Sequence, residues 1–154
     1  MSHTATLNRR IIDGLYSEAL VLADEVRAAF DLSGRLDEAG RDDDAARIAL
    51  SCEALRTMTR MMQAIAWLLN HRAYFAGDLS DFQLRRYGRL VPDHPGGDPA
   101  KVALLELHLR ELIAETERFY ARLLRLDRGW REAEPHFPSA IERLRERIAQ
   151  SAAR

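Results

Sequence analysis

The sequence predicts an all-α fold: an elongated antiparallel three-helix bundle with a short extra helix and a mobile C-terminal tail. Three long stretches place apolar residues at alternating steps of three and four, the spacing of an amphipathic helix. The sequence contains no stretch with strand periodicity and no internal repeat. With 154 residues, 47% of them hydrophobic, the chain can bury one core. We therefore expect a bundle domain over residues 1–130 and a flexible or loosely docked amphipathic tail over residues 131–154.

The first helix is expected over residues 7–32. Apolar side chains follow the helical spacing at Ile12, Leu15, Ala19, Leu22, Val26 and either Ala29 or Phe30. Gly34 favours a helix end, because glycine readily adopts the left-handed conformation that closes helices. A polar connection to about Arg41 follows. The aspartates at 42–44 then suit the N-terminus of a second helix, which explains them with fewer assumptions than cation binding does.

The second helix is expected over residues 43–76, with Gly77 at its end. Its broad apolar face comprises Ala54, Met58, Met61, Met62, Ile65, Leu68, Leu69 and Ala76. A separate stripe lies on the opposite side of the helix and comprises Arg56, Arg60, Gln63, Trp67, His71 and Tyr74. An ordinary solvated face accounts for the arginines and the glutamine but not for Trp67 and Tyr74. Because aromatic residues and arginine are typical of interface anchors, we predict that this stripe is a protein-interaction surface, with a partner or with a second copy.

A short helix is expected next, capped by Ser80 or Asp81 and ending at Tyr87, before a Pro- and Gly-rich loop over residues 91–99. Asp98 and Pro99 then suit the start of a third helix, which we expect to reach about Asp127. Its apolar positions keep the spacing of helices packed in a bundle: Val102, Leu105, Leu109, Leu112, Thr116, Phe119, Leu123 and Leu126.

The tail contains a short amphipathic pattern. Ile141, Leu144 and Ile148 stand among alternating arginines and glutamates. The three long helices would measure roughly 40 to 50 Å at 1.5 Å per residue, so the bundle has a small core for its length. Pairing with a second copy would bury more apolar area, and we therefore expect a homodimer.

Composition narrows the possible functions. The 23 basic and 24 acidic residues give a net charge of −1, so no overall field attracts the protein to nucleic acid or to an anionic membrane. The N-terminal residues lack the apolar core of a signal peptide, and no run approaches the length of a membrane span. Cys52 is the single cysteine, which excludes a disulfide within the chain and fits a reducing compartment. We expect a soluble, cytoplasmic protein.

The sequence offers no convincing catalytic, cofactor-binding or metal site. None of the five histidines has the spacing to another histidine or to a glutamate that helical metal sites require. Cys52 lies beside the apolar face of its helix without an activating motif, and we interpret it as a small core residue. Gly96 and Gly97 lack the lysine and the flanking strand of a phosphate-binding loop. We therefore expect a protein that is not an enzyme and needs no cofactor or metal.

Three stretches resemble one known family. Residues 55–69 (LRTMTRMMQAIAWLL), followed by Arg72, Ala73 and Gly77, are similar to the central signature of the RcdA family of alphaproteobacterial regulators of CtrA degradation. Residues 15–31 resemble that family's first helix, and residues 119–127 resemble the end of its third. The likeness covers about residues 7–130. The side chains at 70–71 and 74–75 depart from the family's usual ones.

This resemblance implies a dimeric, three-helix adaptor without catalytic residues. Members of the RcdA family help deliver cell-cycle regulators, above all the response regulator CtrA, to the ClpXP protease, and act with other adaptors at the cell pole. The departures at residues 70–71 and 74–75 concern the identity of the partners more than the fold. A helical, nucleic-acid-associated regulatory protein is the alternative hypothesis, and a small metal-dependent enzyme is a third. The adaptor hypothesis predicts that Trp67→Ala leaves helicity intact while it weakens self-association or partner capture.

Overall fold

The computed structural model describes residues 7–40, 44–92, 96–133 and 148. Within these residues the chain forms helices and no strand, so the predicted all-α class is confirmed. The helices are α1 (Arg9–Gly40), α2 (Asp44–Ala76), α3 (Asp81–Tyr87), α4 (Pro99–Val102) and α5 (Leu107–Glu132). The predicted tail over residues 131–154 lies, except for 131–133 and 148, outside the described residues.

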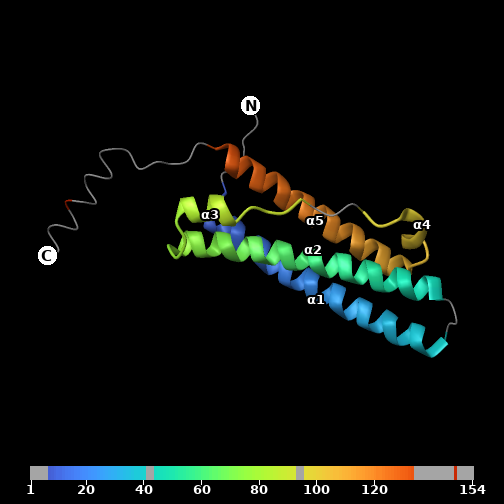
Figure 1. The fold of residues 1–154 in the computed structure, drawn as a ribbon. Coiled ribbons are helices and arrows are strands. Elements are labelled where there is room, and N and C mark those ends of the chain that lie inside the picture. The colour runs from blue at the N-terminus through green and yellow to red at the C-terminus, as the bar shows by residue number, and fades with distance from the viewer. Residues whose placement is uncertain (1–6, 41–43, 93–95, 134–147, 149–154) are drawn as a thin grey trace.

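The three long helices run side by side, with α3 beside one end and α4 beside the other (Figure 1). α1 is antiparallel to both partners, as expected. α2 and α5, however, are parallel, because α3 lies at one end of α2 whereas α4, which precedes α5, lies at the other. The order of the contacts agrees: Arg60 meets Thr116, and Trp67 meets Asp127 further along both helices. A bundle of three helices always contains at least one parallel pair, and in this chain that pair is α2 and α5.

The core lies between α1, α2 and α5. The apolar positions predicted for the first helix are buried from Ile12 to Val26, and of the two alternatives for the last position Phe30 is buried whereas Ala29 is half-buried. α5 contributes a matching row that includes Leu109, Leu112, Phe119 and Leu123. The apolar face predicted for α2 is only partly buried, because Met61 and Leu68 are covered whereas Met62 and Leu69 are 68% and 45% exposed. α2 thus turns a different arc toward its neighbours than its hydrophobic pattern indicated.

Two predicted helix boundaries are wrong. α1 continues through Gly34 to Gly40, because a glycine within a helix costs only about 1 kcal/mol and the residues that follow it include the good helix formers Arg35, Leu36 and Ala39. The predicted third helix is interrupted at residues 103–106, between α4 and α5. No glycine or proline marks this break. Leu105 lies within it and is only 7% exposed, so tertiary packing overrides local propensity there.

The end of α2 and the start of α3 follow their local sequence signals. Gly77 has a φ of 88°, in the left-handed region, and its N–H donates to the carbonyl of Tyr74. The Ser80 hydroxyl accepts from the N–H of Gln83, and the Gln83 side chain accepts from the N–H of Ser80. This reciprocal capping box fixes the first turn of α3, and with it the position of Arg85.

Gly77→Ala should lower the free energy of unfolding by about 1 to 2 kcal/mol, since a Cβ atom is strained in the left-handed conformation. Gly14 supplies a matched control. It is exposed within α1, where an added Cβ atom would meet nothing within 4 Å. Gly14→Ala should therefore stabilise the protein by about 0.5 to 1 kcal/mol. Urea unfolding of the two variants tests this, and a shift of the same sign in both would contradict the role assigned to Gly77.

Candidate protein-interaction surface

The aromatic and arginine stripe of α2 faces α5, not solvent. Of its six residues, Arg60, Trp67 and His71 are at most 4% exposed within the single chain. Arg56 is exposed, and Gln63 and Tyr74 are half-buried. The stripe is thus covered, but by another helix of the same chain. The prediction that it forms an exposed docking surface is wrong for its three buried members, and an interface role for the other three stays a prediction.

Trp67 and Asp127 form the centre of this helix–helix contact. The indole N–H of Trp67 donates to Oδ1 of Asp127 at 2.9 Å, and both side chains are buried. The Nε of Arg131 also donates to Asp127, to Oδ1 at 3.1 Å and to Oδ2 at 3.0 Å. Arg131 continues to α3, where its Nη1 donates to the carbonyl of Arg85. One carboxylate therefore ties α2 to α5 and, through Arg131, to α3.

Arg60 makes a second buried polar contact with α5. Its Nη1 donates to Oγ1 of Thr116 at 3.0 Å, and its Nη2 lies 3.6 Å from Oε1 of Glu117. The Thr116 hydroxyl in turn donates to the carbonyl of Ile113. A buried guanidinium is tolerated only when its donors are satisfied, so Thr116 and Glu117 are what allow an arginine at this position.

The remaining stripe residues have weaker roles. The Tyr120 hydroxyl lies within hydrogen-bond distance of Gln63 Oε1 and of the Val91 carbonyl. The Tyr74 ring is 6.3 Å from the Trp130 ring. Arg56 donates to the buried carboxylate of Glu53 on its own helix at 2.8 Å, and this contact does not reach α5. Gln63 and Tyr74 therefore extend the contact between α2 and α5 at its edges.

His71 is buried between Trp67 and Trp130, whose rings lie 4.0 and 5.3 Å from the imidazole. Its Nδ1 lies 3.1 Å from the Trp67 carbonyl, which can only accept, so Nδ1 carries the proton. Nε2 has no hydrogen-bond partner among the described residues. Burial lowers the pKa of His71 to about 4, although the Trp67 carbonyl and the charge of Asp127 act in the opposite direction.

This lowered pKa predicts a loss of stability in mild acid. The unfolded chain protonates His71 near its ordinary pKa of 6.5, whereas the folded chain resists protonation down to about 4. The contribution of neutral His71 to the free energy of unfolding is therefore fully present above pH 6.5 and is lost as the pH falls toward 4. Between pH 7 and pH 5 it should amount to about 2 kcal/mol. Urea midpoints at the two pH values, for the wild type and for His71→Gln, measure it, and an equal pH dependence of both proteins would refute it.

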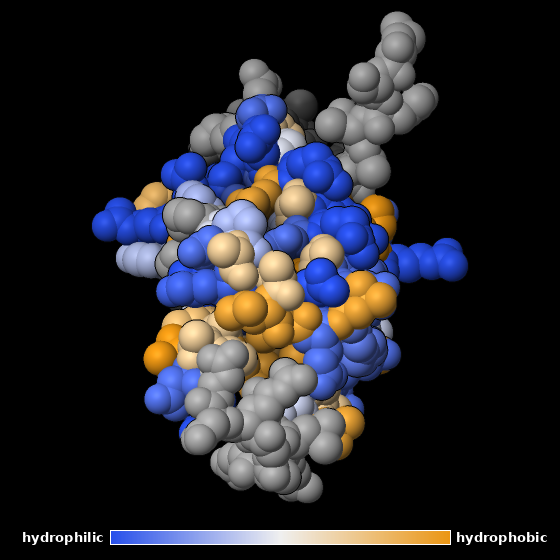
Figure 2. Space-filling view, turned by 90° about the vertical axis from the view of Figure 1, so that its right-hand side faces the viewer, coloured by the Kyte–Doolittle hydropathy of each residue, from blue (hydrophilic) through white to orange (hydrophobic). Residues whose placement is uncertain are grey.

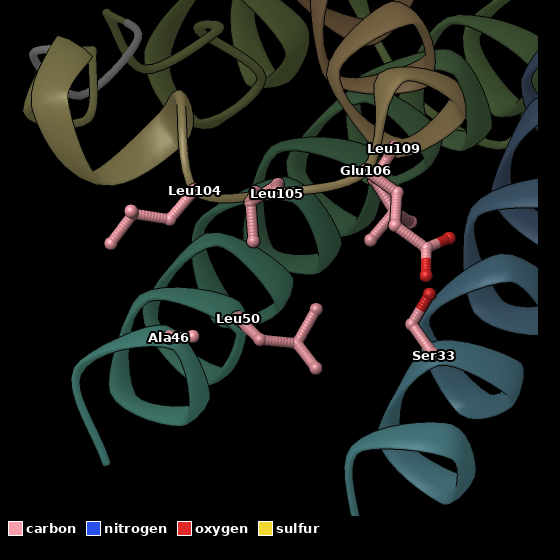
Figure 3. Close-up of a pocket in the computed structure, with 7 residues that line it drawn as sticks. All are labelled: Ser33, Ala46, Leu50, Leu104, Leu105, Glu106 and Leu109. Atoms are coloured by element: carbon pink, nitrogen blue, oxygen red, sulfur yellow. The ribbon is translucent and has the colours of Figure 1, made fainter. Parts of the chain in front are cut away.

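A second surface, not anticipated from the sequence, lies at the end of the molecule where α5 begins. Figure 2 faces this end and shows apolar side chains gathered at its centre, bordered by hydrophilic ones. A shallow hollow there, which we call the end hollow, is drawn in Figure 3. It is lined by Ser33, Ala46, Leu50, Leu104, Leu105, Glu106 and Leu109. Leu104 is 50% exposed at its edge. With a volume of about 30 Å³, the hollow is too small for a metabolite and suits the tip of an inserted side chain.

A wider groove, which we call the acidic groove, lies between α1 and α5 and shares two residues with the end hollow. Its volume is about 550 Å³. It is lined by Glu25, Ala28, Ala29, Leu32, Ser33, Glu106, His108, Glu111, Leu112 and Glu115. α1 and α5 share less contact with each other than either shares with α2, which leaves this seam open. Apolar side chains form the floor of the groove, and four carboxylates stand along it.

The described residues also include other candidate features. No group of three or more His, Cys, Asp or Glu side chains there is placed to hold a metal ion. Cys52, interpreted above as a core residue, is exposed, because it lies on the arc of α2 that turns away from its neighbours. No helix in this part of the chain is both long and apolar enough to cross a bilayer.

The residues that sequence reasoning missed are Asp127 and the groove carboxylates. Asp127 was placed at the end of the third helix, although it is the main partner of Trp67. A usable signal existed: Thr116 interrupts the apolar row of that helix, and Asp127 comes eleven residues later on the same face. Polar residues at core positions indicate polar partners on the facing helix. The groove carboxylates carried no such signal, because exposed glutamates are common on any helix.

The fold and its surfaces define a small all-α protein with a polar helix–helix contact inside and shallow apolar and acidic hollows outside. The chain belongs to the family DUF1465, described as a protein of unknown function, and the match covers residues 3–152. Comparison with curated proteins and with solved structures returned no significant match.

Proposed function

We propose that this protein is a non-enzymatic adaptor of regulated proteolysis, similar to RcdA, which helps deliver cell-cycle regulators to the ClpXP protease. The end hollow is the observation that carries this proposal. Apolar side chains gather at this end of the molecule (Figure 2), Leu104 is 50% exposed at the edge of the hollow, and the space inside fits a side chain and not a substrate. Contiguous exposed apolar surface is typical of protein-binding sites. The resemblance of residues 55–69 to the RcdA signature supports the particular role.

An adaptor of this kind acts by binding two proteins at once. Holding cargo next to the unfoldase raises the local concentration of each for the other, without any chemical step. Two or more binding surfaces are needed for this, and we propose that a homodimer of the chain provides them. Concentration at the cell pole, other adaptors as partners and a cytoplasmic location belong to the same proposal.

Reconstituted degradation tests the role. The full chain is added to the ClpXP protease and the CtrA-type response regulator of its own organism, together with their other adaptors, and the half-life of the regulator is measured. We expect the half-life to shorten when the chain is present. An unchanged half-life together with a salt-sensitive shift of DNA mobility would favour the nucleic-acid-associated alternative and overturn the proposal.

One substitution tests whether the end hollow takes part. Leu104→Asp places a charge at the edge of the hollow and should abolish the acceleration of degradation. Leu20→Asp is the matched control, since Leu20 is 44% exposed on α1 and lines neither hollow. Equal activity of the two variants, both folded as judged by circular dichroism, would remove the end hollow from the mechanism.

A further inference from the structure

We propose that the acidic groove is the docking site for the chain's own C-terminal segment, residues 141–150, bound as a basic amphipathic helix. The inference is independent of the adaptor role. It rests on the chemistry of the groove, on the sequence pattern of the segment and on the length of chain that joins the two.

The groove has an apolar floor and an acidic border. Ala28, Ala29, Leu32 and Leu112 provide the floor, and Leu32 is 61% exposed. Glu25 stands on the α1 side, while Glu106, Glu111 and Glu115 stand on the α5 side. With the side chains that the structure describes, none of these four carboxylates forms an ion pair. Elsewhere the same two helices are joined by an ion pair between Glu18 and Arg122.

The C-terminal segment has the complementary pattern. At 100° per residue, Ile141, Leu144 and Ile148 fall on one narrow face of a helix. Arg145 and Arg147 then flank this face on its two sides, where they would meet the carboxylates of α1 and of α5. Residues 141–150 contain three arginines and two glutamates, a net charge of +1. Ile148, which the structure does describe, is helical and 58% exposed.

The connecting chain has the required length. Glu115 precedes the end of α5 by 17 residues, about 26 Å along the helix at 1.5 Å per residue. Residues 133–140 include Pro135 and Pro138, which favour an extended chain of about 3.1 Å per residue, so these eight residues span about 25 Å. A chain that turns back along α5 therefore reaches the level of Glu115 at residue 140. A helix over residues 141–150 then covers about 15 Å, to the level of Glu106.

Paramagnetic broadening in the full-length chain tests the docking. A nitroxide is attached at Ser151→Cys in a Cys52→Ser background, and amide signals are compared with the nitroxide oxidised and reduced. We expect the amides of Ala28, Leu32 and Glu111 to lose most of their intensity. Leu144→Asp, which removes the central apolar anchor, and Glu111→Lys, which reverses a border charge, should each restore it. Asp78→Lys is the matched control. It reverses a charge beyond the C-terminal end of α2, away from the groove, and should leave the broadening unchanged.

Three outcomes would overturn the proposal. The first is full intensity at the groove amides of the labelled chain. The second is equal broadening in Leu144→Asp, which would show proximity without the specific contact. The third comes from a mixture of two samples, one ¹⁵N-labelled without nitroxide and the other carrying the nitroxide without ¹⁵N. Broadening of the ¹⁵N signals in this mixture would show that the occupant is the tail of a second copy. Dispersed amide spectra of every variant confirm that the fold is retained.

Discussion

Asp127→Ala should lower the free energy of unfolding by about 3 kcal/mol, because it removes the one acceptor shared by two buried donors. The indole N–H of Trp67 and the Nε of Arg131 both donate to this carboxylate. Without it, the indole loses its hydrogen bond in a dry site, and the guanidinium, whose side chain is only 20% exposed, loses its counter-ion. Chemical denaturation monitored by circular dichroism measures the loss. The midpoint temperature of thermal unfolding should fall by about 10 °C.

Two further variants isolate the cause. Asp127→Asn keeps an oxygen that can accept from the indole but removes the charge that balances Arg131, so its loss should be smaller than that of Asp127→Ala. Asp78→Ala, at an exposed site beyond the end of α2, should stay within about 0.5 kcal/mol of the wild type. If Asp127→Ala behaved like Asp78→Ala, the polar contact between α2 and α5 would not stabilise the fold as described.

Trp67→Ala should be at least as damaging, with a loss of about 4 kcal/mol, because it leaves a large cavity between α2 and α5. The indole is 2% exposed and contacts His71 as well as Asp127. This expectation replaces the one drawn from the sequence, which treated Trp67 as an exposed anchor that could be removed without effect on the fold. Denaturant midpoints distinguish the two interpretations directly.

Trp67→Phe and Met62→Ala are the variants with which Trp67→Ala should be compared. Phenylalanine fills most of the cavity but cannot donate to Asp127, so its cost should lie between that of Trp67→Ala and the wild type. Met62 is on the same helix and 68% exposed, and its truncation should cost little. A Trp67→Ala protein as stable as Met62→Ala, but defective in partner capture, would restore the exposed-surface interpretation.

The helices themselves were largely predictable because their signals are local. The apolar spacing from Ile12 to Phe30 identified the buried face of α1, and Gly77 and Ser80 marked the end of α2 and the start of α3. Such signals act through a few neighbouring residues, so a single sequence contains them. The continuation of α1 through Gly34 and the break before Leu107 were not predictable in this way, since packing of distant residues decides both.

The arrangement of the helices was harder to predict from the sequence. Short loops favour antiparallel neighbours, and no sequence signal places α4 at the opposite end of α2 from α3, the arrangement that makes α5 parallel to α2. The stripe was misinterpreted for a related reason. Trp67, Arg60 and Gln63 have the composition of a binding surface whether the partner is another protein or another helix of the same chain. Thr116 and Asp127 distinguish the two cases, but only when they are considered together with the stripe.

The unequal contacts among the long helices have a consequence for folding order. α1 and α2 are consecutive in the chain, share the largest interface and are joined by only three residues, so their pairing costs little loop-closure entropy. The segment from Gly77 to Glu106 that joins α2 to α5 is longer, so the pairing of α5 with the other two helices costs more loop-closure entropy. We therefore expect native-state hydrogen exchange to reveal two cooperative units, with α5 opening at a lower free energy than the hairpin of α1 and α2. A protein that releases one helix while the other two stay paired would expose Trp67 and His71 only transiently.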